Sequence, residues 1–195
     1  MCPLPRSVKF LGIVAFVLFI GAQYCVYNAI FSQIVNLLKI PSDFISTINV
    51  VTISGIVISH LFAWAIFSTL TYCSFRMFKF NITYSTTFLI VGHIYFILTL
   101  YLCITLLLNP ESVLSISSLL ATNFSLNWIV KMVVTTLVSI LYLTFLFSTE
   151  LNVSFTKALV PVVVSFALLY VVLIPLSYIS YTQQKHYLQQ LLQHL

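Results

Sequence analysis

Hydrophobic residues dominate this chain in long, uninterrupted runs that are separated by short polar turns. No charged residue occurs between Asp43 and Arg76, and none occurs between Lys79 and Glu111. About 20 helical residues cover the roughly 30 Å hydrocarbon core of a bilayer, and both runs are longer than that. The pattern therefore predicts an all-α fold, a polytopic bundle of transmembrane helices.

Five membrane-spanning helices are predicted from the spacing of these runs. The first run follows basic residues as a signal peptide would, but it is too long for one, so we interpret it as a retained span. The uncharged stretch 112–126 is rich in Ser, Thr and Asn, and we expect it to be an exposed or interfacial loop rather than a sixth span. The predicted spans are about 10–34, 48–73, 84–108, 127–147 and 158–181.

The chain is predicted to form one bundle over residues 1–182, followed by an amphipathic tail over residues 183–195. At helical spacing the tail places its apolar residues on one face and its glutamines elsewhere. It is either an interfacial helix lying on the membrane or a helix that docks on a partner. Its apolar positions are Tyr187, Leu188, Leu191, Leu192 and Leu195.

Composition supports a membrane class and excludes others. The 195 residues are 61% hydrophobic and 6% charged, whereas a soluble domain carries about 25% charged residues. The net charge of +5 comes from eight basic residues spread along the loops, which is not the clustered basic face of a nucleic-acid-binding protein. The four cysteines show no CxxC pair and no metal-ligand spacing, so we expect neither a disulfide nor a metal among them. They are Cys2, Cys25, Cys73 and Cys103.

The basic residues predict how the chain is oriented in the membrane, because cytoplasmic loops carry an excess of Lys and Arg. Two doublets, one before the first span and one after the second, set this topology. With the N-terminus in the cytoplasm, that side holds Arg6, Lys9, Arg76, Lys79 and Lys157, and the far side holds Lys39, Lys131 and Lys185. We therefore predict a cytoplasmic N-terminus and a C-terminus on the opposite side.

Two polar patterns within the spans are candidate functional features. Gly55, Ser59 and Ala63 recur every four residues and predict a helix-packing seam, because small side chains let helices approach closely in lipid. At about 1.5 Å of rise per residue from the predicted cytoplasmic ends of their spans, Gln23, His60 and His93 are expected at similar, roughly central depths.

His93 of the third span completes this possible mid-membrane polar layer of Gln23, His60 and His93. The layer has two interpretations: a path for protons or substrate that uses histidine, or interhelical hydrogen bonds that fix helix register. The lack of a carboxylate within any predicted span favours the second interpretation.

The sequence offers no recognisable catalytic or cofactor-binding set. Ser59 and His60 are adjacent, which on a helix points their side chains about 100° apart. The acids Asp43, Glu111 and Glu150 fall in different predicted loops, and no GxSxG, HExxH or Walker motif is present. We therefore expect a non-enzymatic protein without metal or cofactor.

From the second span onward, the layout resembles the Ypt-interacting-protein (Yip) family of five-span membrane proteins, especially its small bacterial members. The resemblance covers about residues 8–181. It rests on the basic turn Phe75-Arg76-Met77-Phe78-Lys79-Phe80-Asn81, on Val91-Gly92-His93-Ile94-Tyr95, on Phe124-Ser125-Leu126-Asn127-Trp128, and on Leu151-Asn152-Val153-Ser154-Phe155-Thr156-Lys157-Ala158. It implies a place beside ABC-type exporters or in envelope stress and toxin resistance, in the bacterial cytoplasmic membrane. A eukaryotic endomembrane is the alternative location.

Two functional hypotheses follow. The first is an accessory or assembly subunit of a larger membrane complex that contacts another membrane protein or a second copy of itself within the lipid bilayer. The second is a small transporter or pore subunit that uses the polar layer. The accessory-subunit hypothesis predicts that the chain co-purifies with a partner. The transporter hypothesis predicts a flux across the membrane that depends on His60 and His93.

Overall fold

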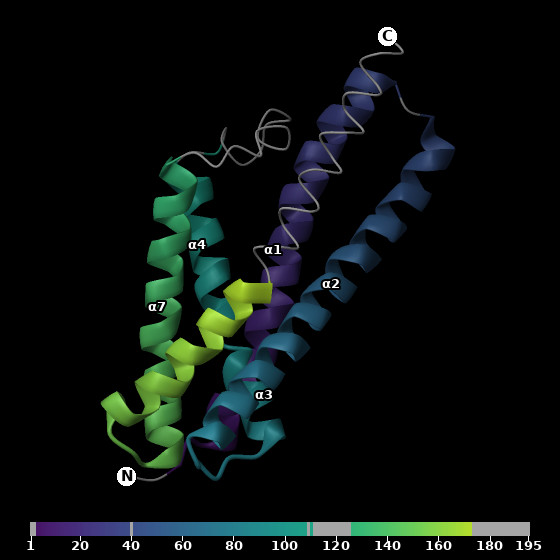
Figure 1. Cartoon of the computed structure of the whole chain (residues 1–195). Helices are drawn as coiled ribbons and strands as arrows, with labels where there is room; N and C mark the ends of the chain where they lie inside the picture. Colours follow the sequence, from purple (N-terminus) through teal and green to yellow (C-terminus); the bar gives the residue numbers. More distant parts are fainter. Residues whose placement is uncertain (1–2, 40, 109, 111–125, 173–195) are drawn as a thin grey trace.

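The computed structural model describes residues 3–39, 41–108, 110 and 126–172, and these residues form helices joined by tight turns (Figure 1). In chain order the labelled helices are α1 (Arg6–Leu38), α2 (Ser42–Met77), α3 (Tyr84–Val91), α4 (Ile94–Leu108) and α7 (Leu126–Leu151). A further helix, Phe155–Val172, follows α7.

The five-span, all-α fold class is confirmed. Five helical segments are long and apolar enough to cross a membrane: Arg6–Asn36, Phe44–Met77, Tyr84–Leu108, Met132–Leu151 and Phe155–Val172. The helices α1 and α2 extend several residues beyond the predicted spans at both ends. The predicted loop (except Leu126, which begins α7) and the predicted tail lie outside the described residues, and the orientation of the termini stays a prediction.

The core is concentrated at one end of the bundle, where α1 begins and where α2 and α7 end. Phe75 of α2 is fully buried, and its ring packs on Phe147 of α7 with centroids 4.4 Å apart. Ala158 and Val162 of the last helix are fully buried as well. These contacts join α2, α7 and the last helix into one packed end, which lies at the bottom of Figure 1.

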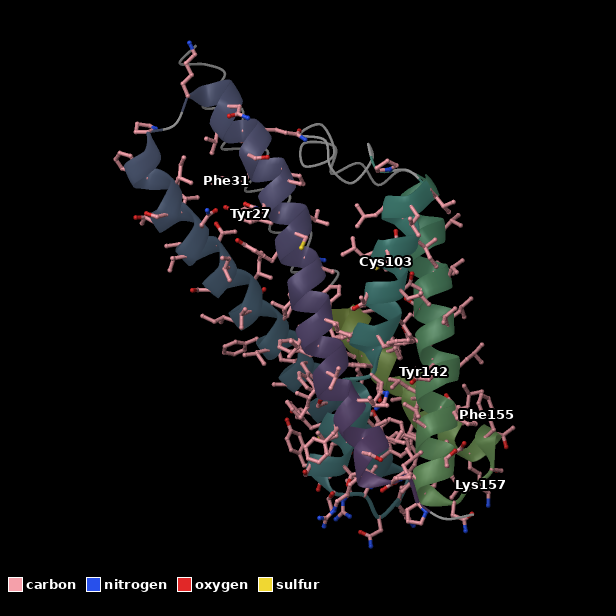
Figure 2. The ribbon with its side chains drawn as sticks, turned by 180° about the vertical axis from the view of Figure 1, so that it is seen from behind. Tyr27, Phe31, Cys103, Tyr142, Phe155 and Lys157 are labelled. Atoms are coloured by element: carbon pink, nitrogen blue, oxygen red, sulfur yellow. The ribbon has the colours of Figure 1, made fainter. Side chains whose placement is uncertain are left out.

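The opposite half of the bundle is more open. In both views the upper ends of α1 and α2 lean away from those of α4 and α7 (Figures 1 and 2), although lower down α1 packs more extensively against α4 than against α2. From Phe44 to Ala63, no side chain of α2 is buried. A long stretch of α2 thus packs only partly against the rest of the described chain.

The turn after α2 ends the helix with a Schellman motif, which fixes the basic turn in place. Lys79 has a left-handed backbone (φ 62°), its N–H bonds to the Arg76 carbonyl, and the Phe80 N–H bonds to the Phe75 carbonyl. The Phe80 ring lies against the Phe75 ring, the hydrophobic contact that accompanies this motif.

Candidate functional site

The third predicted span is broken into α3 and α4 at Gly92 and His93. Across the break the backbone bonds are three residues apart: His93 N–H to the Ile90 carbonyl (3.1 Å), Tyr95 N–H to the Gly92 carbonyl (3.1 Å) and Phe96 N–H to the His93 carbonyl (3.0 Å). This spacing is that of the tighter 3₁₀-helix. The break lies where the chain crosses α1 and α2.

The crossing with α1 depends on two glycines. A Cβ atom on Gly12 would lie 2.3 Å from the Leu89 carbonyl oxygen, and one on Gly92 would lie 2.5 Å from Cζ2 of Trp64 and 3.1 Å from the Gly12 carbonyl carbon. Real Cβ contacts are not that short, so only glycine lets the two backbones approach this closely. Gly12 and Gly92 therefore set the distance between α1 and the break.

His93 is held by two other helices at this crossing. Its side chain is buried (3% exposed). Nε2 lies 2.8 Å from the Val8 carbonyl of α1, and Nδ1 lies 3.2 Å from the Tyr142 hydroxyl of α7. Because a carbonyl only accepts, Nε2 carries a proton, and in the neutral ring the Tyr142 hydroxyl donates to Nδ1. The imidazole thus ties α1 to α7 with both nitrogens in use.

Two further side chains bond to backbone carbonyls near the break. The Trp64 Nε1–H donates to the Phe88 carbonyl (2.8 Å), and the Tyr95 hydroxyl donates to the His60 carbonyl (2.7 Å). The indole of Trp64 also stacks on the Phe88 ring, with centroids 4.3 Å apart. A side chain of α2 thus bonds to the backbone of α3, and a side chain of α4 bonds to the backbone of α2.

His60 is in contact with aromatic rings of two other helices. Its ring meets Phe19 edge-on at 5.0 Å and Tyr95 at 6.0 Å. Tyr95 also bonds to the His60 carbonyl, whereas the ring contact of His93 is with Tyr142, so the two histidines contact different aromatic side chains.

Gln23 does not share the depth of His93. His93 bonds to Val8 in the first turn of α1, and Gln23 lies fifteen residues further along the same helix, about 22 Å of helical rise. Gln23 is half-buried, and it lies just over one turn beyond Phe19, which contacts His60. The structure therefore places His60 between the levels of His93 and Gln23.

The small residues of the predicted seam face away from the other described helices. Gly55, Ser59 and Ala63 are exposed, and a Cβ on Gly55 would meet no heavy atom within 4 Å. The Ser59 hydroxyl bonds to the Ile56 carbonyl of its own helix (2.9 Å). If these small residues form a helix-packing seam, we therefore expect the helix that packs on them to belong to another molecule.

The residues predicted to set the topology lie at the packed end of the bundle, which we call the basic end. Lys9 forms an ion pair with Glu150 of α7, whose other carboxylate oxygen accepts the Leu4 N–H at 2.9 Å. The side chains of Lys9 and Glu150 are 16% and 12% exposed. Arg6, Arg76, Lys79 and Lys157 are exposed at this same end (Lys157 is labelled in Figure 2).

Sequence reasoning missed several residues of the crossing. Glycines within apolar runs are a signal of close backbone approach, and Gly12 and Gly92 carried that signal. Tyr142 in the middle of a span carried a weaker one, since a buried hydroxyl needs a partner. The pairing of Glu150 with Lys9 had no local signal, because the two residues lie 141 positions apart.

Within the described ranges, no group of three or more His, Cys, Asp or Glu side chains is placed to hold a metal ion. Cys25, Cys73 and Cys103 are free and exposed. No protein-family model, curated protein or solved structure matches this chain. The class that the fold defines is an all-helical, polytopic integral membrane protein.

Proposed function

We propose that this chain is a non-enzymatic accessory or assembly subunit that works by lateral contact with another membrane protein. The observation that carries the proposal is the outward face of α2 between Phe44 and Ala63, where no side chain is buried by this chain. Within a bilayer such a face meets either lipid or another protein.

The chemistry of that face favours protein over lipid. Hydroxyl and very small side chains recur along it among aliphatic ones, and small residues give lipid little surface while letting a second helix approach closely. Gly55 offers the closest approach, because nothing lies within 4 Å of its Cβ position. The exposed small and hydroxyl residues are Ser46, Thr47, Ser54, Gly55, Ser59 and Ala63.

The helix crossing supports a scaffold rather than a transport path. Both ring nitrogens of His93 are engaged by the Val8 carbonyl and the Tyr142 hydroxyl, and His60 is flanked by aromatic rings. Hydrogen bonds of this kind fix helix register at about 0.6 kcal/mol each. Such a crossing holds α2 in place and leaves its outward face available to a partner.

The partner we propose is a transmembrane helix of a different membrane protein. The resemblance to the Yip family supports an exporter of the ABC type as the larger complex, in the bacterial cytoplasmic membrane. Association of two copies of this chain through the same face is the second outcome that the experiment distinguishes.

The test uses two glycine variants that are matched in structure. Gly55→Leu adds bulk to the outward face of α2, and Gly21→Leu adds the same bulk to α1, where a Cβ also meets nothing within 4 Å. The tagged full chain is purified in mild detergent from its native membrane. We expect the wild type and Gly21→Leu to retain a stoichiometric partner and Gly55→Leu to lose it.

Two results would contradict the proposal. One is a wild-type chain that always elutes alone, without a partner or a second copy. The other is a Gly55→Leu chain that retains as much partner as Gly21→Leu. If only copies of this chain are retained, the contact is self-association and the role as an accessory subunit is withdrawn.

A further inference from the structure

The basic end carries positive charge that the described protein does not neutralise. The one acid at this end among the described residues is Glu150, and it is engaged by Lys9 and by the Leu4 N–H. The remaining cations come from three separate helices and one turn, and all are exposed. They are Arg6, Arg76, Lys79 and Lys157.

Large apolar side chains are exposed among these cations. Met77 is 72% exposed and Phe78 is 43% exposed, and both lie between Arg76 and Lys79. Tyr84 at the start of α3 and Phe155 at the start of the last helix are exposed to a similar degree. Exposed aromatic and apolar residues interleaved with Lys and Arg at the ends of spans are typical of the headgroup layer of a bilayer.

From this arrangement we infer that the basic end is a binding surface for the phosphate headgroups of anionic phospholipids. The cations surround the ends of the spans, where headgroups lie, and the apolar side chains between them reach the acyl boundary. A soluble acidic protein would have to cover Met77 and Phe78 at the membrane surface, whereas lipid does so without further cost. This end also faces the leaflet that is predicted to be cytoplasmic, where anionic lipids are enriched.

The surface does not depend on the partner proposed for α2, since it lies at the other end of that helix. Each Lys or Arg near a charged membrane surface strengthens the attraction about fivefold, which corresponds to about 1 kcal/mol. Attraction between exposed charges is also screened by salt. The surface therefore predicts a preference for anionic lipid that falls with each cation removed and with ionic strength.

The full chain, reconstituted in phosphatidylcholine vesicles, tests this inference. Trace spin-labelled phosphatidylglycerol or phosphatidylcholine reports the lipid at the protein boundary, in both leaflets, so the result does not depend on orientation. We expect the wild type to prefer phosphatidylglycerol and to lose most of that preference in high salt. The variant that neutralises all four cations to glutamine should show no preference.

Two lysines provide a matched single-residue comparison. Lys79 and Lys39 are both exposed and both left-handed (φ 62° and 51°), but they lie at opposite ends of α2. Lys79→Gln should lower the relative association constant of phosphatidylglycerol several-fold, up to the fivefold scale of one surface cation. Lys39→Gln should change it least, because Asp43 lies four residues away in the sequence. The conservative variant Lys79→Arg should keep the preference.

Three results would overturn the inference: a wild type without preference, a preference that survives removal of all four cations, or equal effects of Lys79→Gln and Lys39→Gln. If the variant that lacks all four cations does not reconstitute, the comparison of Lys79→Gln with Lys39→Gln still tests the inference. Circular dichroism of each reconstituted variant separates loss of lipid binding from loss of helix.

Discussion

Replacing Gly12 by alanine tests whether the helix crossing holds the fold together. The added methyl group would lie 2.3 Å from the Leu89 carbonyl oxygen and 3.2 Å from Cδ2 of His93. The first distance is about 1 Å shorter than ordinary van der Waals contact. The obstructing atom belongs to a helix backbone, so α1 and α3 must separate, which strains the bond between His93 and Val8.

The expected loss comes from opposing effects of different size. Alanine is the better helix former by about 1 kcal/mol. Overpacking against backbone costs about 1–3 kcal/mol, and a weakened interhelical hydrogen bond adds about 0.6 kcal/mol. We expect the free energy of unfolding of Gly12→Ala to fall by about 0.6–2.6 kcal/mol, whereas that of Gly21→Ala should rise slightly, because nothing lies near its Cβ position.

The assay is reversible unfolding of the purified chain by titration with SDS in mixed micelles, followed by circular dichroism. Gly21→Ala is the control, since it makes the same chemical change on the same helix. Equal stability of the two variants would refute the reasoning, because it would mean that α1 and α3 do not approach as closely as the structure shows.

Three further substitutions test other parts of the packed end by the same titration. Tyr142→Phe removes the donor to His93 Nδ1 and should lower the free energy of unfolding by about 0.6–1.7 kcal/mol, while Tyr24→Phe on the exposed side of α1 should leave it unchanged; a smaller loss for Tyr142→Phe than for Tyr24→Phe would contradict the assigned bond. Glu150→Gln leaves the Lys9 ammonium without its carboxylate and should cost about 1.5–3 kcal/mol; a stability equal to that of the wild type would show that the ion pair contributes nothing. Lys79→Gly relieves a left-handed backbone and should gain up to about 1 kcal/mol, whereas Lys79→Val should lose stability; the opposite order would argue against the Schellman motif.

The spans were predictable because each one is a local property of the sequence. A run of more than 20 apolar residues between charges specifies a membrane helix with no knowledge of its neighbours, and five helices long and apolar enough to cross a membrane were found. The helix ends were less predictable. Lys39 and Asn152 end α1 and α7 in left-handed conformations, a role more often taken by glycine.

The crossing could not be derived in the same way, because its geometry is set by tertiary contacts. Counting helical rise from Tyr84 placed His93 near the depth of Gln23. The count could not reveal that α1 meets the break within three turns of its own start, where Gly12 contacts Leu89. The partner of Glu150 could not be predicted for the same reason, because several segments at the basic end carry a Lys or Arg that could pair with it.

The packed end and the outward face of α2 should therefore respond differently to substitution. Gly55→Leu should leave the free energy of unfolding unchanged or raise it by up to about 1 kcal/mol, because leucine is the better helix former and meets no neighbour. It should nevertheless abolish capture of the partner. Gly12→Ala should lower stability and reduce capture only as far as it lowers the folded fraction.

Measuring capture and SDS unfolding on the same preparations separates these two effects. A Gly55→Leu chain that unfolds as readily as Gly12→Ala would show that the outward face of α2 is covered by this chain itself. Lateral contact through that face would then be ruled out, because the small residues would be serving the internal packing of the monomer.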